Sequence, residues 1–231
     1  MGIQAVLIDF DGTLANTNEV IIKSFQHTYR TFLGREEDPA VIRASFGEPL
    51  KVTMGRVFGD AYENEAVCVY RSFQTGRFQN LIEAFPGMTE LVKQLKKQGL
   101  KVALVTSRVR ESALLGLEKF GLSGDFDWVT AIDNITKHKP DPESIDVTLA
   151  ELGGIAPENA VMIGDSRFDI LCAKNAGCRS VLVDWSVSGP EERKFMNADY
   201  IAKNAEDILM WIRKEGEWDA TDKECKSAYS G

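Results

Sequence analysis

The part of this sequence that decides the fold is Ala-Val-Leu-Ile-Asp-Phe-Asp-Gly-Thr, residues 5–13. Its four leading apolar residues predict a buried strand over residues 5–8. Asp9 and Asp11 follow at once, two positions apart and therefore on one side of the chain. Ligands of open parallel sheets bind at the carboxyl ends of the strands, so this pair is expected in a functional site. The alternative is an Asp-Gly turn that only closes the strand.

Downstream of residue 85, short apolar runs alternate with amphipathic stretches. This rhythm predicts βα units, and hence an α/β fold with a doubly wound, Rossmann-like parallel sheet. We expect further strands at 102–105, 129–132, 161–163 and 181–183, separated by helices at 88–98, 111–120, 142–152 and 168–176.

A different pattern occupies residues 18–80, where apolar residues recur at helical spacing and no convincing strand is found. We therefore expect an all-helical cap domain over residues 17–82, inserted into a core domain made of residues 1–16 and 83–215. Hinges near 14–17 and 80–86 would permit a lid-like motion. The polar residues 216–231 are expected to form a flexible tail.

The amino-acid composition argues against several classes of binding partner. The chain has 27 Lys and Arg against 35 Asp and Glu, a net charge of −8, which argues against broad binding to nucleic acid or to anionic membranes. No apolar run approaches the length of a membrane span. The four cysteines form no Cys-x-x-Cys pair, which favours free thiols and a cytoplasmic protein.

Polar side chains also follow three other predicted strands. They are Thr106, Ser107 and Arg108 after the second strand, Lys139 after the third, and Asp165 and Asp169 after the fourth. Asp9 and Asp165 could offer oxygen ligands to Mg²⁺. Thr106 could hold phosphate oxygens, and Lys139 could oppose their negative charge. Each has a structural alternative: a helix N-cap for Thr106 and Ser107, a solvated loop charge for Lys139, and a charged helix start for Asp165 and Asp169.

In combination, these motifs resemble the haloacid dehalogenase superfamily of phosphotransferases over residues 3 to about 205. The resemblance implies Asp9 as nucleophile, Asp11 as general acid and base, and Thr106 and Lys139 as phosphate holders. It also implies Mg²⁺ bound by Asp9, Asp165 and the backbone carbonyl of Asp11, with Asp169 as an outer acidic residue of the metal site.

An insert at this point of the chain looks like the helical cap shared by phosphoglycolate phosphatases, β-phosphoglucomutases and an inorganic pyrophosphatase of this superfamily. Residues 17–28, 70–73 and 139–143 are similar to the pyrophosphatase group. We therefore expect a small phosphorylated substrate, with pyrophosphate first and 2-phosphoglycolate or a sugar phosphate next. A monomer or a weak homodimer is expected.

Specificity is expected to lie in the cap. Residues 45–50 look like the specificity loop of this group, in which Gly47 would let the backbone approach a small substrate. Arg71 and Arg43 could meet a second phosphate or a carboxylate, although surface arginines are more often solvated or ion-paired. Ser107 and Arg108 are further candidates because they adjoin motif residues.

Two alternatives remain open. A β-phosphoglucomutase-like enzyme would be expected to carry a histidine where this chain has Ile21. A non-enzymatic phosphoaspartate switch would use a similar set of side chains, but Asp11 would shorten the life of its phosphoaspartate.

Overall fold

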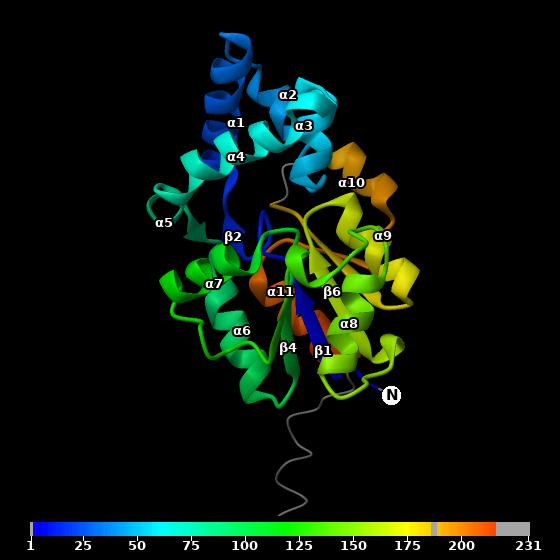
Figure 1. The fold of residues 1–231 in the computed structure, drawn as a ribbon. Helices are drawn as coiled ribbons and strands as arrows, with labels where there is room; N and C mark the ends of the chain where they lie inside the picture. Colours follow the sequence, from blue (N-terminus) through cyan, green and yellow to red (C-terminus); the bar gives the residue numbers. More distant parts are fainter. Residues whose placement is uncertain (1, 186–188, 216–231) are drawn as a thin grey trace, which may run out of the picture.

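The structure is a computed structural model that describes residues 2–185 and 189–215. Its centre is a six-stranded sheet in the order β5-β4-β1-β6-β7-β8, and all neighbouring pairs are parallel. The strands are β1 (Ala5–Ile8), β4 (Lys101–Val105), β5 (Trp128–Thr130), β6 (Ala160–Gly164), β7 (Arg179–Val183) and β8 (Tyr200–Ala202). Helices cover both faces of this sheet (Figure 1), so the predicted doubly wound α/β fold is confirmed.

Strand β1 lies between β4 and β6, and all four of its residues are buried. Its side chains alternate between two apolar layers. Val6 and Ile8 pack into the larger cluster with α6 (Met88–Lys97), α7 (Arg110–Lys119) and α11 (Ala205–Glu215). Ala5 and Leu7 pack into the second cluster with α8 (Glu143–Glu151) and α9 (Arg167–Ala176). A four-residue apolar run is therefore enough to bury both faces of the central strand.

Three features of the core differ from the predicted pattern. The strand expected at 129–132 ends at Thr130, because the Ala131 N–H donates to the Asn134 side chain and starts the short helix η2 (Ile132–Asn134). The edge strand β8 and the helices α10 (Pro190–Met196) and α11 were not predicted. A three-residue edge strand is too short to show an alternating pattern. One more short helix, η3 (Pro157–Asn159), precedes β6.

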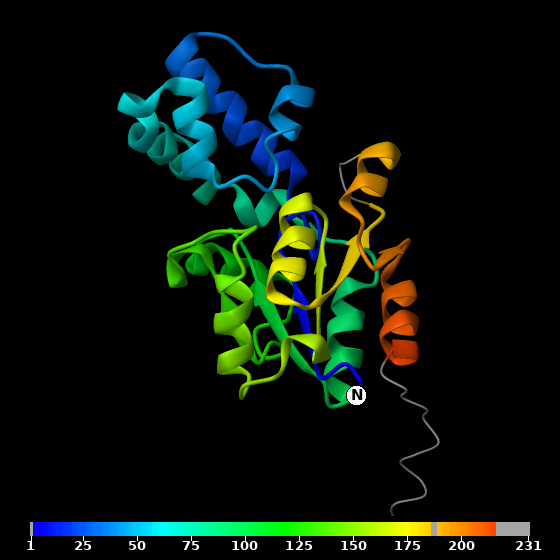
Figure 2. The same ribbon diagram turned by 90° about the vertical axis from the view of Figure 1, so that its right-hand side faces the viewer.

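Residues 17–82 contain helices and no strand of the central sheet. The helices are α1 (Asn18–Leu33), α2 (Pro39–Arg43), α3 (Leu50–Phe58), η1 (Asp60–Tyr62), α4 (Glu63–Thr75) and α5 (Phe78–Leu81). We call residues 17–82 the cap and the remaining described residues the core. In Figure 2 the first four α-helices stand apart from the sheet, beyond the carboxyl ends of its strands. They share a small apolar cluster that includes Phe25, Tyr29 and Tyr70.

The chain crosses between core and cap twice, and the two crossings pair with each other. Strand β2 (Ala15–Asn16) runs antiparallel to β3 (Glu83–Ala84) as a two-stranded sheet. The sequence predicted hinges here but no strands, because two-residue strands have no periodicity. Across the described residues, we find no helix that is both long enough and apolar enough to span a membrane. The predicted tail at 216–231 lies outside the described residues.

Candidate active site

A cavity of about 760 Å³ lies between the core and the cap, at the carboxyl ends of β1, β4 and β6. Asp9 and Asp11 line it at the end of β1. The Asp9 N–H donates to the Ile163 carbonyl at 2.9 Å, so the hydrogen bonding between β1 and β6 continues up to the first carboxylate. Asp9 is buried and Asp11 is half-buried. The structure thus places the two acidic residues at the ligand-binding edge of the sheet.

The buried ammonium of Lys139 links three segments of the core. It donates to Asp9 Oδ1 at 2.9 Å, to Asp169 Oδ1 at 2.6 Å and to the Val105 carbonyl at 2.8 Å. Burial by itself would lower the pKa of Lys139, but the carboxylates of Asp169 and Asp9 outweigh it and raise that pKa. Lys139 therefore carries its positive charge at the bottom of the cavity.

The acidic side chains around the Lys139 ammonium outnumber the basic ones. Burial raises the pKa of Asp9 to about 7, with further contributions from Asp169 and Asp11, while Lys139 acts in the opposite direction. Burial, Asp169 and Asp9 also raise the pKa of Asp165 well above its ordinary range. Three carboxylates share one ammonium, so the site favours a further cation.

The carboxylates of Asp9, Asp165 and Asp169 could hold such a cation, because oxygen atoms of all three lie within 4.8 Å of one another. Oxygen donors suit hard divalent ions such as Mg²⁺. Asp169 is already engaged on both oxygens, by Lys139 through Oδ1 and by the Ser166 hydroxyl through Oδ2 at 2.6 Å. The contacts of Asp169 therefore hold Lys139 and the start of α9.

Gly12 allows the backbone that follows Asp11 to pass close to the Asp165 carboxylate. Its φ is +76°, and a Cβ there would lie 2.2 Å from Asp165 Oδ2. Any side chain at this position would displace the Asp165 carboxylate, so the glycine is required by close approach as well as by backbone conformation.

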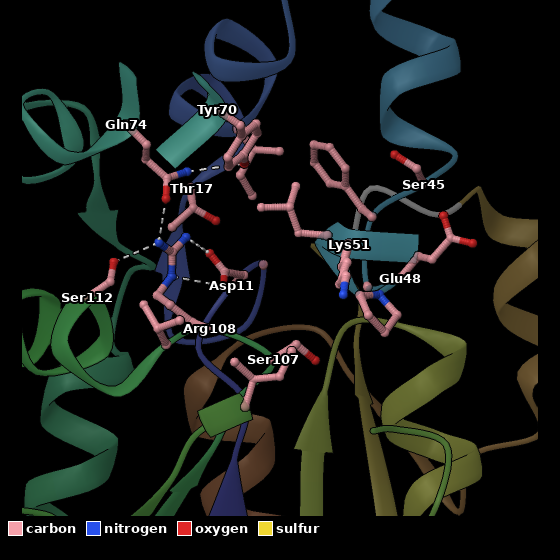
Figure 3. A pocket seen from close by; sticks show the side chains of 18 of the residues that line it. Asp11, Thr17, Ser45, Glu48, Lys51, Tyr70, Gln74, Ser107, Arg108 and Ser112 are labelled. Atoms are coloured by element: carbon pink, nitrogen blue, oxygen red, sulfur yellow. Dashed lines mark hydrogen bonds and ion pairs between the residues drawn. The ribbon is translucent and has the colours of Figure 1, made fainter. Parts of the chain in front are cut away.

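Arg108 lines the cavity and joins the core to the cap (Figure 3). Its guanidinium holds the Asp11 carboxylate with two bonds, Nε to Oδ2 at 3.1 Å and Nη2 to Oδ1 at 2.6 Å. Nη1 donates to Gln74 Oε1 of α4 at 3.0 Å and to Ser112 Oγ at 2.9 Å. The guanidinium carbon also lies 4.3 Å from the centre of the Phe78 ring. Arg108 therefore holds the Asp11 carboxylate and connects it through Gln74 to the cap.

Comparison with known proteins agrees with this geometry. Residues 6–183 match the family model of the haloacid dehalogenase-like hydrolases. The chain belongs to the haloacid dehalogenase-like hydrolases. Pyrophosphatase PpaX of Halalkalibacterium halodurans is 37% identical over 209 residues, which cover 90% of this chain and 96% of the relative. Pyrophosphatase PpaX of Bacillus cereus is 35% identical with the same coverage.

Solved structures show the same fold. A haloacid dehalogenase-like family protein of Streptococcus pneumoniae superposes with a TM-score of 0.80 at 25% identity, covering 90% of this chain and 98% of that one. A predicted phosphoglycolate phosphatase of Haemophilus somnus gives a TM-score of 0.80 at 23% identity and covers 90% and 97%. The family and the pyrophosphatase relatives together make this haloacid dehalogenase-like hydrolase a phosphohydrolase.

The remaining predicted site residues take different positions. Ser107 lines the cavity. Thr106 is buried at the end of β4, where its Oγ1 accepts from the Arg108 N–H at 3.1 Å, and it is not among the residues that line the cavity. Arg71 lines the cavity on α4 with an exposed side chain, and Arg43 does not line it.

Sequence reasoning did not single out Gln74 or Thr17 as site residues, although both line the cavity. Gln74 is one helical turn after Tyr70, and its Nε2 donates to the Tyr70 hydroxyl at 3.1 Å. That i, i+4 spacing on an amphipathic helix is a signal that could have directed attention to it. The sequence pattern places Thr17 only within a hinge.

Gly47 allows a loop of the cap to pack closely against the core of this hydrolase. Its φ is +83°, and a Cβ there would lie 2.9 Å from Phe168 Cδ2 and 3.1 Å from Ser166 Cβ, at the start of α9. We expect Gly47→Ala to lower kcat/KM by about tenfold or more, because the cap loop must withdraw from α9 and catalytic positions shift with it. The matched control is Gly34→Ala, since Gly34 has a φ of +65° and a Cβ there would have nothing within 4 Å. Equal losses of activity in the two variants would show that backbone strain alone is responsible.

The carboxylate group also predicts a pH dependence of stability in EDTA. Folded Asp9, with a pKa of about 7, keeps its proton over a pH range in which an unfolded Asp, with a pKa of 3.8, has lost it. The native state thus binds more protons, and the free energy of unfolding is expected to fall by about 1–3 kcal/mol as the pH rises from 5 to 8. Carboxyls with lowered pKa values, Asp127 and Glu143 among them, complete their titration below this range.

Urea unfolding at several pH values measures this slope. Asp9→Asn should reduce the slope and leave the part that Asp165 contributes, and saturating Mg²⁺ should oppose the slope by favouring the ionised carboxylates. A stability that rises between pH 5 and pH 8 in EDTA would contradict the assignment of the slope to Asp9.

Proposed function

We propose that the protein is a Mg²⁺-dependent phosphohydrolase that cleaves inorganic pyrophosphate through a phosphoaspartate at Asp9. The observation that carries the chemistry is the buried Lys139, held between the Asp9 and Asp169 carboxylates beside the cavity. The choice of pyrophosphate is supported by the PpaX relatives, which are matched over 96% of their length. A cavity that the cap covers suits a small substrate.

In the first half of the proposed reaction, an Asp9 oxygen attacks the nearer phosphorus of pyrophosphate. A bond forms between that oxygen and phosphorus while the bridging P–O bond breaks, and Asp11 donates a proton to the departing phosphate. The Lys139 charge offsets repulsion between the anionic nucleophile and the anionic substrate. Mg²⁺ held by Asp9 and Asp165 would add charge neutralisation at the transferring phosphoryl group.

In the second half, water attacks the phosphorus of the phosphoaspartate. Asp11, now ionised, accepts a proton from that water, and the bond between Asp9 and phosphorus breaks. Phosphate leaves, and both aspartates return to their starting protonation states. The cap would exclude bulk water during the first transfer.

The alternatives differ in the leaving group or in its fate. A phosphoglycolate or sugar phosphate phosphatase would use the same core residues. A mutase is disfavoured by a specific observation, since Ile21 lines the cavity at the position where that group has a histidine, and an alkyl side chain cannot transfer a proton. A phosphoaspartate switch is disfavoured because Asp11 would activate water, and that water would hydrolyse the phosphoaspartate that carries the signal.

The proposal also includes a cytoplasmic location and small-molecule partners only. Free thiols at Cys68, Cys172 and Cys178 support a reducing compartment. The surplus of acidic residues is consistent with the absence of a nucleic-acid or membrane role.

Phosphate release with Mg²⁺ tests the proposal across pyrophosphate, 2-phosphoglycolate, sugar phosphates and p-nitrophenyl phosphate. We expect kcat/KM for pyrophosphate to exceed the others by about a hundredfold, equivalent to roughly 2.7 kcal/mol of transition-state discrimination. EDTA should abolish activity, and Ca²⁺ should inhibit because a larger ion misplaces the reacting groups. A flat profile, or a preference for 2-phosphoglycolate or a sugar phosphate, would reject pyrophosphate as the substrate.

A further inference from the structure

The cap-facing wall of the cavity has a buried cation whose role is not explained by phosphoryl transfer at Asp9. The cations lining the cavity are Lys51, Arg71, Arg108 and Lys139. Lys139 is engaged by carboxylates of the core, while Lys51 and Arg71 are exposed. Arg108 is buried with 9% of its surface exposed and lies beside Asp11, the proposed proton donor to the leaving group.

We propose that Arg108, Gln74 and Thr17 form the subsite for the second anionic group of the substrate, which is the phosphate that departs. This inference rests on the proposed function, because it assigns the leaving-group side of the same reaction. It makes Arg108 a specificity residue and assigns a binding role to a hydroxyl and an amide that the phosphoryl-transfer step does not use.

The hydrogen bonds of Arg108 leave capacity for a ligand. A guanidinium has five N–H groups. Four of them are directed to Asp11, Gln74 and Ser112, and only one bond from Nη2 is made to a described residue. One N–H of Nη2 is therefore available to an acceptor in the cavity.

The charge of Arg108 points to the same ligand. Arg108 is a buried cation, and Asp11 is the carboxylate that pairs with it. Guanidinium groups bind phosphate oxygens well, because their fixed N–H groups match the spacing of those oxygens. A phosphate at this position would add a second anionic partner for the guanidinium.

Thr17 provides an independent observation. Thr17 is one of the residues that line the cavity, and its buried hydroxyl has no hydrogen-bond partner among the described residues. Thr17 occupies the N-cap position of α1, yet its side chain makes no capping bond. Figure 3 shows Thr17 among the side chains that line the cavity. A buried hydroxyl without a partner destabilises the fold, so a bound phosphate oxygen is a reason for it to be there.

The three residues come from both parts of the molecule. Arg108 belongs to the core, whereas Gln74 and Thr17 belong to the cap and its first hinge. The subsite is therefore complete only when cap and core are together, and a substrate with two anionic groups would bridge them. A monoester whose second group carries no charge in the bound substrate, such as p-nitrophenyl phosphate, would engage only the core residues.

Thr17→Val is the sharpest test, because it removes one hydroxyl and keeps the shape. We expect kcat/KM for pyrophosphate to fall by about 10- to 100-fold, as for a lost hydrogen bond to a charged group, while the value for p-nitrophenyl phosphate changes by less than about twofold. The melting temperature should rise by about 2–4 °C, because an unpaired buried hydroxyl is removed. If Thr17 has only a structural role, Thr17→Val will raise the melting temperature without changing the ratio of kcat/KM for the two substrates.

Thr13→Val is the matched control, since Thr13 is also buried with an unpartnered hydroxyl but does not line the cavity. It should raise the melting temperature similarly and leave the ratio of the two substrates unchanged. Arg108→Met should lower both rates, because Arg108 also contacts Asp11, and should lower the pyrophosphate rate by at least a further tenfold. Equal losses on both substrates in Thr17→Val and in Arg108→Met would overturn the subsite.

The same variants separate the subsite from the choice of substrate. If the parent enzyme prefers 2-phosphoglycolate to pyrophosphate, the proposed function fails. The carboxylate of 2-phosphoglycolate is then the second anion, and the subsite stands only if Thr17→Val reduces that preference over p-nitrophenyl phosphate by about tenfold. An unchanged preference would overturn the subsite as well.

Discussion

Asp9→Asn is expected to lower kcat/KM for pyrophosphate by about 10⁴-fold, because the amide has the shape of the carboxylate but is a far weaker nucleophile toward phosphorus. The protein should remain folded. Its melting temperature in EDTA should equal or exceed that of the parent, since Asp9 is one of three buried carboxylates that share a single ammonium. Phosphate release and thermal unfolding, measured on the same preparation, check both parts of this prediction.

The parent enzyme, quenched in acid during turnover, should carry a phosphoryl group that Asp9→Asn lacks, which intact-protein mass would detect. Asp146→Asn provides a matched control, because Asp146 is an exposed carboxylate on α8 that does not line the cavity. That control should keep its activity within about twofold. If Asp9→Asn retains activity within about tenfold of the parent, Asp9 is not the nucleophile.

Lys139→Met is expected to reduce both stability and turnover. The variant leaves the buried carboxylates of Asp9 and Asp169 without their counter-ion, and breaking a buried pair in this way costs about 3–5 kcal/mol. For a chain of this size, the melting temperature in EDTA at pH 8 should fall by roughly 10 °C. Turnover should fall by about 10³-fold because the substrate loses a fixed positive charge.

The stability loss in Lys139→Met should be smaller at pH 5.5 than at pH 8, because the orphaned carboxylates become neutral by taking up protons. A second substitution, Asp169→Asn, should restore part of the stability of Lys139→Met without restoring turnover. Lys137→Met is the control, since Lys137 is exposed and its ion pair with Asp141 spans 3.8 Å; it should cost less than about 0.5 kcal/mol. A loss below about 1 kcal/mol in Lys139→Met would show that Lys139 is not the counter-ion of this group.

The central strands were predictable because a parallel strand covered on both faces consists almost entirely of apolar residues. That property makes residues 5–8, 102–105 and 161–163 recognisable without any knowledge of their neighbours. Parallel strands place their carboxyl ends at one edge of the sheet, so the side chains that follow them are expected at that edge. The proximity of Asp9, Lys139 and Asp165 could thus be expected from the sequence alone.

The sequence by itself determined the α/β core, the alternation of its strands and helices along the chain and the position of the acidic site. These features depend on local patterns and on the geometry of parallel sheets. Only the tertiary structure decided that Arg108 holds Asp11 and reaches Gln74, contacts that join residues 97 and 34 positions apart. It also decided that Thr17 is buried in the cavity without a partner among the described residues. The physical reason is that these contacts depend on how the cap sits against the core, and helical periodicity determines which face of a helix is apolar but not which surface that face will meet.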